Sequence, residues 1–91
     1  MREICDKEEI LLIFDEVQTG MGMTGRMWAF QHYDVIPDVI SFGKKTQVCG
    51  ILANKEKLDQ IPNNVFKESS RINSTFGGNY IDMLRFKLIL E

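Results

Sequence analysis

The chain has 91 residues, of which 44% are hydrophobic and 26% are charged, and its formal net charge is −2. This length allows one small domain at most, and such a domain buries only a little over ~60% of the surface that its unfolded chain exposes. No basic run attracts nucleic acid or an anionic membrane, and the longest apolar stretch, Ile10 to Phe14, is far shorter than the ~20 residues that span a bilayer. We therefore expect a cytoplasmic protein without nucleic-acid or membrane partners, and two isolated cysteines agree with a reducing compartment.

The first part of the chain alternates short apolar segments with loops. Residues 2–8 have the character of a helix end, and the continuous apolar run 10–14 predicts a strand buried on both faces of a parallel sheet. A glycine-rich loop follows at 19–25. Residues 27–33 then predict a short helix that buries its tryptophan and phenylalanine, and 39–42 predict a second strand.

The rest of the chain continues this alternation. Residues 49–53 predict a third strand, 56–60 one helical turn, and 63–78 a polar loop. Asn79 is a candidate cap for a final helix over 80–91, in which the apolar residues keep helical spacing. Strands that alternate with helical segments favour an α/β fold.

Two charged residues stand at the ends of predicted strands. Asp15 closes the first apolar run, and Lys44 follows the second strand in the run S-F-G-K-K-T. A strand that ends in Asp15 and Glu16 has three interpretations. It is a buried strand that merely ends in carboxylates, a Walker B strand whose carboxylates hold Mg²⁺ and orient water, or a strand whose aspartate pairs with the ring nitrogen of pyridoxal phosphate. Only the third requires a later lysine, which forms a Schiff base with the cofactor, while the second requires a G-x-x-x-x-G-K-[ST] loop that this chain lacks.

Other motifs carry less information. Residues 20–25 fit G-x-G-x-x-G, but the run 15–19 separates them from the strand, so a tight surface loop is the better interpretation. Residues 73–79 place hydroxyl groups and two glycines before the last predicted helix, which suits either a phosphate site or an ordinary capped turn. His32 and the scattered cysteines lack the spacing of metal ligands, so no metal site is expected.

Three motifs occur in order along the chain: F-D-E-V-Q-T-G, P-D-V-I-S-F-G-K-K and N-S-T-F-G-G-N. Together they resemble the class III aminotransferases, pyridoxal-phosphate enzymes of fold type I, over residues 10–91. The resemblance implies an α/β fragment of the large cofactor-binding domain, with a mainly parallel sheet and flanking helices. Residues 1–91 are then a partial domain, incomplete at both ends. The charged start and the uncapped last helix lead to the same expectation of an internal piece of a longer protein.

The resemblance also implies roles for individual residues in binding the cofactor. Asp15 would pair with the pyridine nitrogen, and Val17 would pack on one face of the ring. Gln18 would hydrogen-bond near the phenolic oxygen of the ring. Lys44, the first of two adjacent lysines, would be the Schiff-base residue and the proton carrier of the reaction. Asp15 and Lys44 are therefore the expected catalytic residues.

Two residues of the downstream run complete the expected site. Thr75 would reach the cofactor phosphate of the neighbouring subunit, because these enzymes form homodimers with shared active sites. Asn73 is a candidate contact for the substrate. Many family members carry an arginine where this chain has Met23, and its absence fits the branch of the family that acts on lysine.

The run F-G-K-K-T-Q-V-C-G is most similar to that branch, whose members transfer the terminal amino group of L-lysine. The implied reaction uses 2-oxoglutarate as the acceptor and gives an aldehyde and glutamate. The chain alone is not expected to be active. Three alternatives remain open: a relative that acts on ornithine or 4-aminobutyrate, an ATPase fragment that uses Asp15 and Glu16, and an inactive gene product.

Overall fold

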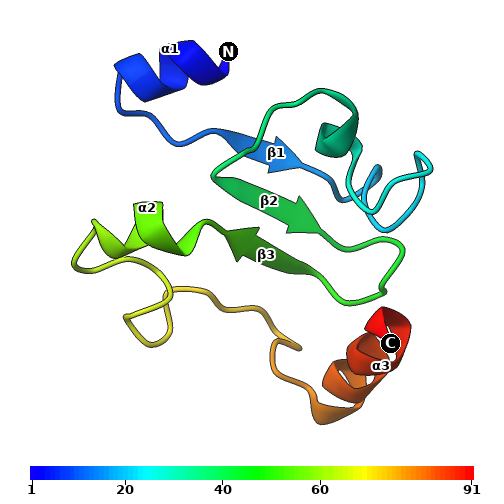
Figure 1. Ribbon diagram of the computed structural model, residues 1–91. Helices are drawn as coiled ribbons and strands as arrows, with labels where there is room; N and C mark the ends of the chain where they lie inside the picture. The colour runs from blue at the N-terminus through cyan, green and yellow to red at the C-terminus, as the bar shows by residue number, and fades with distance from the viewer. The chain divides into compact units, whose positions relative to one another are not determined.

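The computed structural model describes residues 1–91, which form two compact units, 1–53 and 54–91. Each unit is described by itself. The first unit contains α1 (Arg2–Lys7), β1 (Ile13–Asp15), the 3-10 helix η1 (Ala29–His32), β2 (Val39–Phe42) and β3 (Gly50–Ala53) (Figure 1). The second contains α2 (Lys55–Asp59) and α3 (Tyr80–Leu90). No helix in the chain is both long enough and apolar enough to cross a lipid bilayer.

The sheet of the first unit has the order β1-β2-β3, with β2 in the centre (Figure 1). Strands β1 and β2 are parallel, as predicted, and Asp15 lies opposite Ser41. Strand β3 runs antiparallel to β2, with Gly50 opposite Phe42. The sheet is therefore mixed rather than mainly parallel within this chain. The short connection 43–49 explains the difference, because a parallel return requires a crossover of a dozen residues or more.

The first strand is shorter and less buried than its apolar run predicts. Strand β1 starts at Ile13, not at Ile10, and the side chain of Ile13 is 62% exposed. The prediction of burial on both faces is therefore wrong for this chain. Its physical reason is that no helix of the chain packs extensively on β1, whereas burial on both faces requires helices over them. The small apolar core of the unit consists of Leu12, Ile40, Phe42 and Val48.

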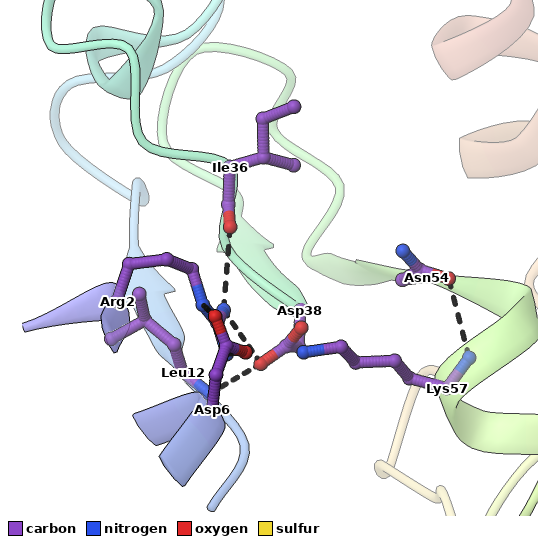
Figure 2. Close-up of polar contacts among 7 residues, drawn as sticks. All are labelled: Arg2, Asp6, Leu12, Ile36, Asp38, Asn54 and Lys57. Carbon is purple, nitrogen blue, oxygen red and sulfur yellow. Dashed lines mark hydrogen bonds and ion pairs between the residues drawn. The ribbon is translucent and has the colours of Figure 1, made fainter. Parts of the chain in front are cut away.

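A buried aspartate joins α1 to the start of both parallel strands (Figure 2). One carboxylate oxygen of Asp38, Oδ2, accepts the backbone N–H of Leu12 at 2.7 Å and the Arg2 guanidinium at 2.9 Å. Arg2 also pairs with Asp6 of its own helix at 2.6 Å, and donates to the carbonyl of Ile36 at 3.4 Å. The residue that precedes β2 thus orders the segment that precedes β1.

The predicted helix over 27–33 forms only a short 3-10 helix at Ala29–His32. Trp28 has an extended backbone instead, and its N–H donates to the side-chain oxygen of Gln31 at 2.9 Å. This bond gives a partner to one of the backbone N–H groups that the start of a helix leaves without one. The side chains of Trp28 and Phe30 are half-buried in this chain rather than fully buried.

The second unit contains two capped helices joined by a long loop. Asn54 caps α2 by accepting the N–H groups of Glu56 and Lys57, at 3.0 and 3.3 Å. The predicted cap of the last helix is confirmed, since Asn79 accepts the N–H of Ile81 at 2.9 Å. No helix or strand forms between α2 and α3, as predicted. No residue of α3 is buried within the chain, and its apolar side chains are exposed apart from Phe86, which is half-buried.

Candidate functional site

The parallel pairing of β1 and β2 determines which side chains meet at one edge of the sheet. The carboxyl ends of parallel strands lie at the same edge, so the residues that follow β1 and β2 become neighbours. Asp15 ends β1 and lies opposite Ser41 of β2. Lys44 follows two residues after the end of β2, at Phe42. The sequence-predicted pair, Asp15 and Lys44, therefore belongs to one edge of one sheet.

The Asp15 side chain is exposed and carries two hydrogen bonds on one oxygen. Its Oδ1 atom accepts the backbone N–H of Val17 at 3.0 Å and the hydroxyl of Ser41 at 3.0 Å. The pKa of Asp15 lies below its ordinary value, mainly because of the hydrogen bond from the Val17 N–H and next because of the one from the Ser41 hydroxyl. Desolvation raises this pKa, and the positive charge of Lys44 lowers it further. The carboxylate is therefore ionised at neutral pH and is held in one orientation.

The Lys44 ammonium is held by an amide from the loop that follows β1. Its Nζ atom donates to the side-chain oxygen of Gln18 at 2.7 Å. The turn that carries Lys44 is fixed by Thr46, whose side chain is completely buried. The Thr46 Oγ1 atom lies 2.9 Å from the carbonyl oxygen of Gly43 and 2.6 Å from that of Val48. Lys44 is thus exposed on a turn whose backbone is closed by a buried hydroxyl.

Glu16 has a different environment from its neighbour Asp15. Only 3% of Glu16 is exposed, and its carboxylate accepts the backbone N–H groups of Ala29 and Phe30 at 3.0 and 2.9 Å. A Walker B site needs both carboxylates to face the same metal and water. Because the Glu16 oxygens are occupied by the start of η1, this geometry does not favour the magnesium interpretation. No group of three or more His, Cys, Asp or Glu side chains gathers to form a metal site.

The glycine-rich loop has the geometry of a tight turn. Gly22 and Gly25 both have a φ of +88°, a left-handed conformation that favours glycine. The N–H of Gly25 donates to the carbonyl of Gly22 at 3.1 Å, and that of Gly22 to Met27 at 3.3 Å. No helix starts within the motif, so the geometry favours the predicted surface loop over a dinucleotide fingerprint.

The remaining predicted residues divide between the two units. Val17 is half-buried in the first unit, directly after the carboxylates. Asn73 and Thr75 are exposed in the second unit, in the loop that leads to α3. There the N–H of Gly77 donates to the carbonyl of Ser74 at 3.1 Å, and residues 75–81 line a shallow open depression.

Sequence reasoning missed three residues that organise this edge: Ser41, Thr46 and Glu16. The strand pattern contained a signal for Ser41, because parallel strands that end together place Asp15 and Ser41 side by side. Nothing in the sequence signalled Thr46, since a buried threonine in a polar loop has no periodic pattern. The sequence suggested a role for Glu16 only in the Walker B interpretation, where it would orient water beside the metal.

The comparison with known proteins agrees with the motifs. Residues 1–91 match the family described as Aminotransferase class-III. Over 91 residues the chain is 58% identical to an L-lysine-epsilon aminotransferase of Mycobacterium bovis and 48% identical to one of Streptomyces clavuligerus. It covers 20% of each, so the chain spans about a fifth of the length of these relatives. It is also similar, with a TM-score of 0.85 and 58% identity, to the structure of lysine aminotransferase from Mycobacterium tuberculosis in the internal aldimine form, covering 99% of this chain and 20% of that one. The chain therefore belongs to the class III aminotransferase family, as its three motifs predicted.

Proposed function

We propose that this chain is part of the large cofactor-binding domain of a pyridoxal-phosphate-dependent L-lysine 6-transaminase. The protein transfers the terminal amino group of L-lysine to 2-oxoglutarate and gives an aldehyde and glutamate. The observation that carries the proposal is the shared sheet edge at which Asp15, Gln18 and Lys44 gather. The relatives named L-lysine-epsilon aminotransferase are 46 to 58% identical over 91 residues, which supports the choice of substrate.

The chemistry of these side chains fits pyridoxal phosphate. The cofactor presents a ring nitrogen that carries a proton, a phenolic oxygen and an aldehyde. Asp15 offers an ionised carboxylate, Gln18 an amide and Lys44 a primary amine, all exposed at one edge. When bound, the cofactor supplies an electrophilic aldehyde and an electron-withdrawing pyridinium ring.

Asp15 holds the proton on the ring nitrogen. A carboxylate does this only while it is ionised, and the hydrogen bonds from Val17 and Ser41 keep the pKa of Asp15 low. The same two bonds leave the second oxygen, Oδ2, for the pyridinium N–H. Val17 packs on one face of the ring, next to the carboxylate that it orients.

Lys44 is the residue that would hold the cofactor covalently and carry the proton. Its primary amine is the group that would attach to the cofactor aldehyde and that, when free, would take a proton from the substrate carbon that bears the nitrogen. Gln18 orients the amine beforehand, since its side-chain oxygen is 2.7 Å from Nζ. Lys45 follows in sequence and has no part in this chemistry.

The second unit contributes to a neighbouring active site. Thr75 binds the cofactor phosphate of the partner in a homodimer, and Asn73 contacts the substrate. Exposure of both side chains, on a loop before a capped helix, supports these roles. The amino acid and 2-oxoglutarate are the small-molecule partners, and the enzyme acts in the cytoplasm.

The proposed role of Lys44 is tested in the protein expressed from its complete coding sequence. Lys44→Ala is expected to lose the visible absorbance of the bound cofactor and to reduce turnover by at least about 10³-fold, because both covalent attachment and proton transfer are removed. Lys45→Ala is the matched control and retains both properties. Unchanged turnover and absorbance in Lys44→Ala would refute the proposed role.

The substrate assignment is tested separately with the unmodified protein. Lysine, ornithine and 4-aminobutyrate are offered as amino donors with 2-oxoglutarate, and kcat/KM is compared among them. We expect the highest kcat/KM for lysine. A preference for ornithine or 4-aminobutyrate would overturn the assignment of L-lysine as the amino donor while leaving the transamination chemistry in place.

A further inference from the structure

Glu16 is a buried carboxylate that has no cationic side chain among its hydrogen-bond partners. Its Oε1 atom accepts the N–H of Phe30 at 2.9 Å, and its Oε2 atom accepts the N–H of Ala29 at 3.0 Å and the hydroxyl of Thr19. Burial raises the pKa of Glu16, but the hydrogen bonds from Thr19, Ala29 and Phe30 outweigh it and the net effect is a lowered pKa. The group is therefore an ionised anchor for three donors, one from Thr19 and two from the adjacent residues Ala29 and Phe30 at the start of η1.

These bonds close the loop between β1 and η1 into a compact clasp, defined as residues 16–30. The backbone carbonyl of Glu16 also accepts the N–H of Gly20 at 2.8 Å. Gly20 packs so closely on Trp28 that a Cβ atom there would lie 2.6 Å from the indole ring. Trp28 in turn contacts the core through Phe42, with ring centroids 6.1 Å apart. The clasp is thus fixed to the sheet at both of its ends.

Gln18 lies inside the clasp, between Glu16 and Thr19, and holds the Lys44 ammonium at 2.7 Å. Its backbone belongs to the short segment between Glu16 and Thr19, which is closed by the hydrogen bond from the Thr19 hydroxyl to the Glu16 carboxylate, and the Val17 N–H in the same segment donates to Asp15. The geometry therefore links a buried carboxylate, which touches neither Lys44 nor Asp15 by any of these bonds, to the position of the reactive lysine.

We propose that Glu16 is a positioning residue that holds the clasp closed and so places Gln18 against Lys44. The proposal rests on the proposed function for its catalytic consequence, but its structural content concerns this chain alone. Loss of the Glu16 carboxylate loosens residues 17–30, lets Gln18 move away, and leaves the Lys44 amine without its partner.

The first test uses the cofactor-free protein expressed from its complete coding sequence. In Glu16→Gln a side-chain NH₂ group replaces one of the two carboxylate oxygens and faces a backbone N–H donor. We therefore expect the backbone amides of Ala29 and Phe30 to exchange hydrogen with solvent roughly tenfold faster. Competitive acetylation should label Lys44 roughly threefold faster, with Lys45 unchanged as the internal control. Glu8→Gln removes an exposed carboxylate and is the matched control, with neither rate changed.

The second test asks whether the effect passes through Gln18. Gln18→Ala should also speed Lys44 labelling, and the double variant Glu16→Gln/Gln18→Ala should label no faster than Gln18→Ala, because both changes remove the same contact. Additive effects, or an unchanged Lys44 rate in a clasp that has loosened, would overturn the proposal. If Glu16→Gln fails to fold, Thr19→Val is used in its place, because it removes only one of the three donors to the Glu16 carboxylate. Thr19→Ser keeps the hydroxyl donor and should show the native rates.

The catalytic consequence is measured on the cofactor-bound protein. Glu16→Gln should lower kcat for lysine roughly tenfold and shift the pH titration of the cofactor absorbance, with KM changed less than kcat. If the unmodified protein has no transaminase activity, only the proposed function is refuted. The role of Glu16 is decided separately, by the Lys44 labelling rates in the cofactor-free protein.

Discussion

At the residue scale, two adjacent carboxylates have different surroundings, and we propose a different role for each. Asp15 is exposed and faces Ser41 across the parallel pair, whereas Glu16 is buried and faces the backbone of η1. Alternation of side chains along a strand sends neighbouring residues to opposite faces, which explains how one dipeptide serves a site and its support.

The first prediction concerns the titration of Asp15. Ser41→Ala removes a hydrogen bond that lowers the pKa of Asp15, so that pKa should rise toward its ordinary value. The folded pKa lies below the unfolded one, so the stability that Asp15 contributes is present above the unfolded pKa. That contribution is lost as the pH falls through the folded pKa. Carboxyl ¹³C NMR of aspartate-labelled protein measures this, with Asp15→Asn for assignment.

Ser69→Ala is the control, because Ser69 is exposed in the second unit and does not bond to Asp15. An Asp15 titration that is identical in Ser41→Ala and the unmodified protein would contradict the orienting role of Ser41. At neutral pH Asp15 should be ionised both in Ser41→Ala and in the unmodified protein. The substitution should therefore change the activity at neutral pH much less than it changes the titration of Asp15 in acid.

At the element scale, the sequence predicted most of the elements and the parallel pairing of β1 with β2, but not the antiparallel pairing of β2 with β3. Continuous apolar runs marked β2 and β3, and Asn79 marked the start of α3, because local residue types determine strands and caps. The antiparallel course of β3 and the shortness of η1 depend on contacts between segments. The Trp28–Gln31 bond and the turn closed by Thr46 are examples that no periodicity reveals.

The second prediction tests how tightly the clasp packs. Gly20→Ala places a Cβ atom 2.6 Å from the Trp28 ring and 2.8 Å from the backbone carbonyl of Glu16, and a backbone atom cannot move aside cheaply. We expect a loss of about 1–3 kcal/mol in the free energy of unfolding, from overpacking. The midpoint of thermal unfolding measures it.

Gly43→Ala is the comparison variant. Its Cβ atom would meet the sulfur of Cys49 at 2.9 Å, and that exposed side chain can rotate away. The expected loss is below about 1 kcal/mol, in the range of tolerated substitutions. Equal losses in the two variants would show that Gly20 is not packed more tightly than Gly43.

At the scale of the whole molecule, the site is more predictable than its surroundings. Asp15, Gln18 and Lys44 follow from ordered motifs, because reaction chemistry restricts residue types. Burial does not follow in the same way. The apolar residues of α3 keep helical spacing, yet Ile81 and Leu88 are 71% and 63% exposed in this chain. The chain spans about a fifth of its relatives, so helix faces are only partly covered by the residues within it.

The third prediction concerns the buried aspartate that joins α1 to the sheet. Asp38→Ala leaves the Leu12 N–H and the Arg2 guanidinium without this acceptor, and we expect a loss of about 2–3 kcal/mol. Urea unfolding measures it. Asp6→Ala removes the other carboxylate that pairs with Arg2, but its side chain is 51% exposed, so the loss should stay below about 1 kcal/mol. Similar losses in both variants would contradict a special role for Asp38.

The antiparallel return of β3 has a consequence for the order in which the protein folds. Strands β2 and β3 are joined by the loop 43–49, so their pairing closes a short stretch of chain, whereas pairing of β1 with β2 brings together residues 26 apart, such as Asp15 and Ser41. Contacts between residues that are close in sequence form faster, because closing a short loop costs less chain entropy than closing a long one. The hairpin of β2 and β3, which carries Lys44, is therefore expected to form early, and strand β1 with Asp15 to join it afterwards.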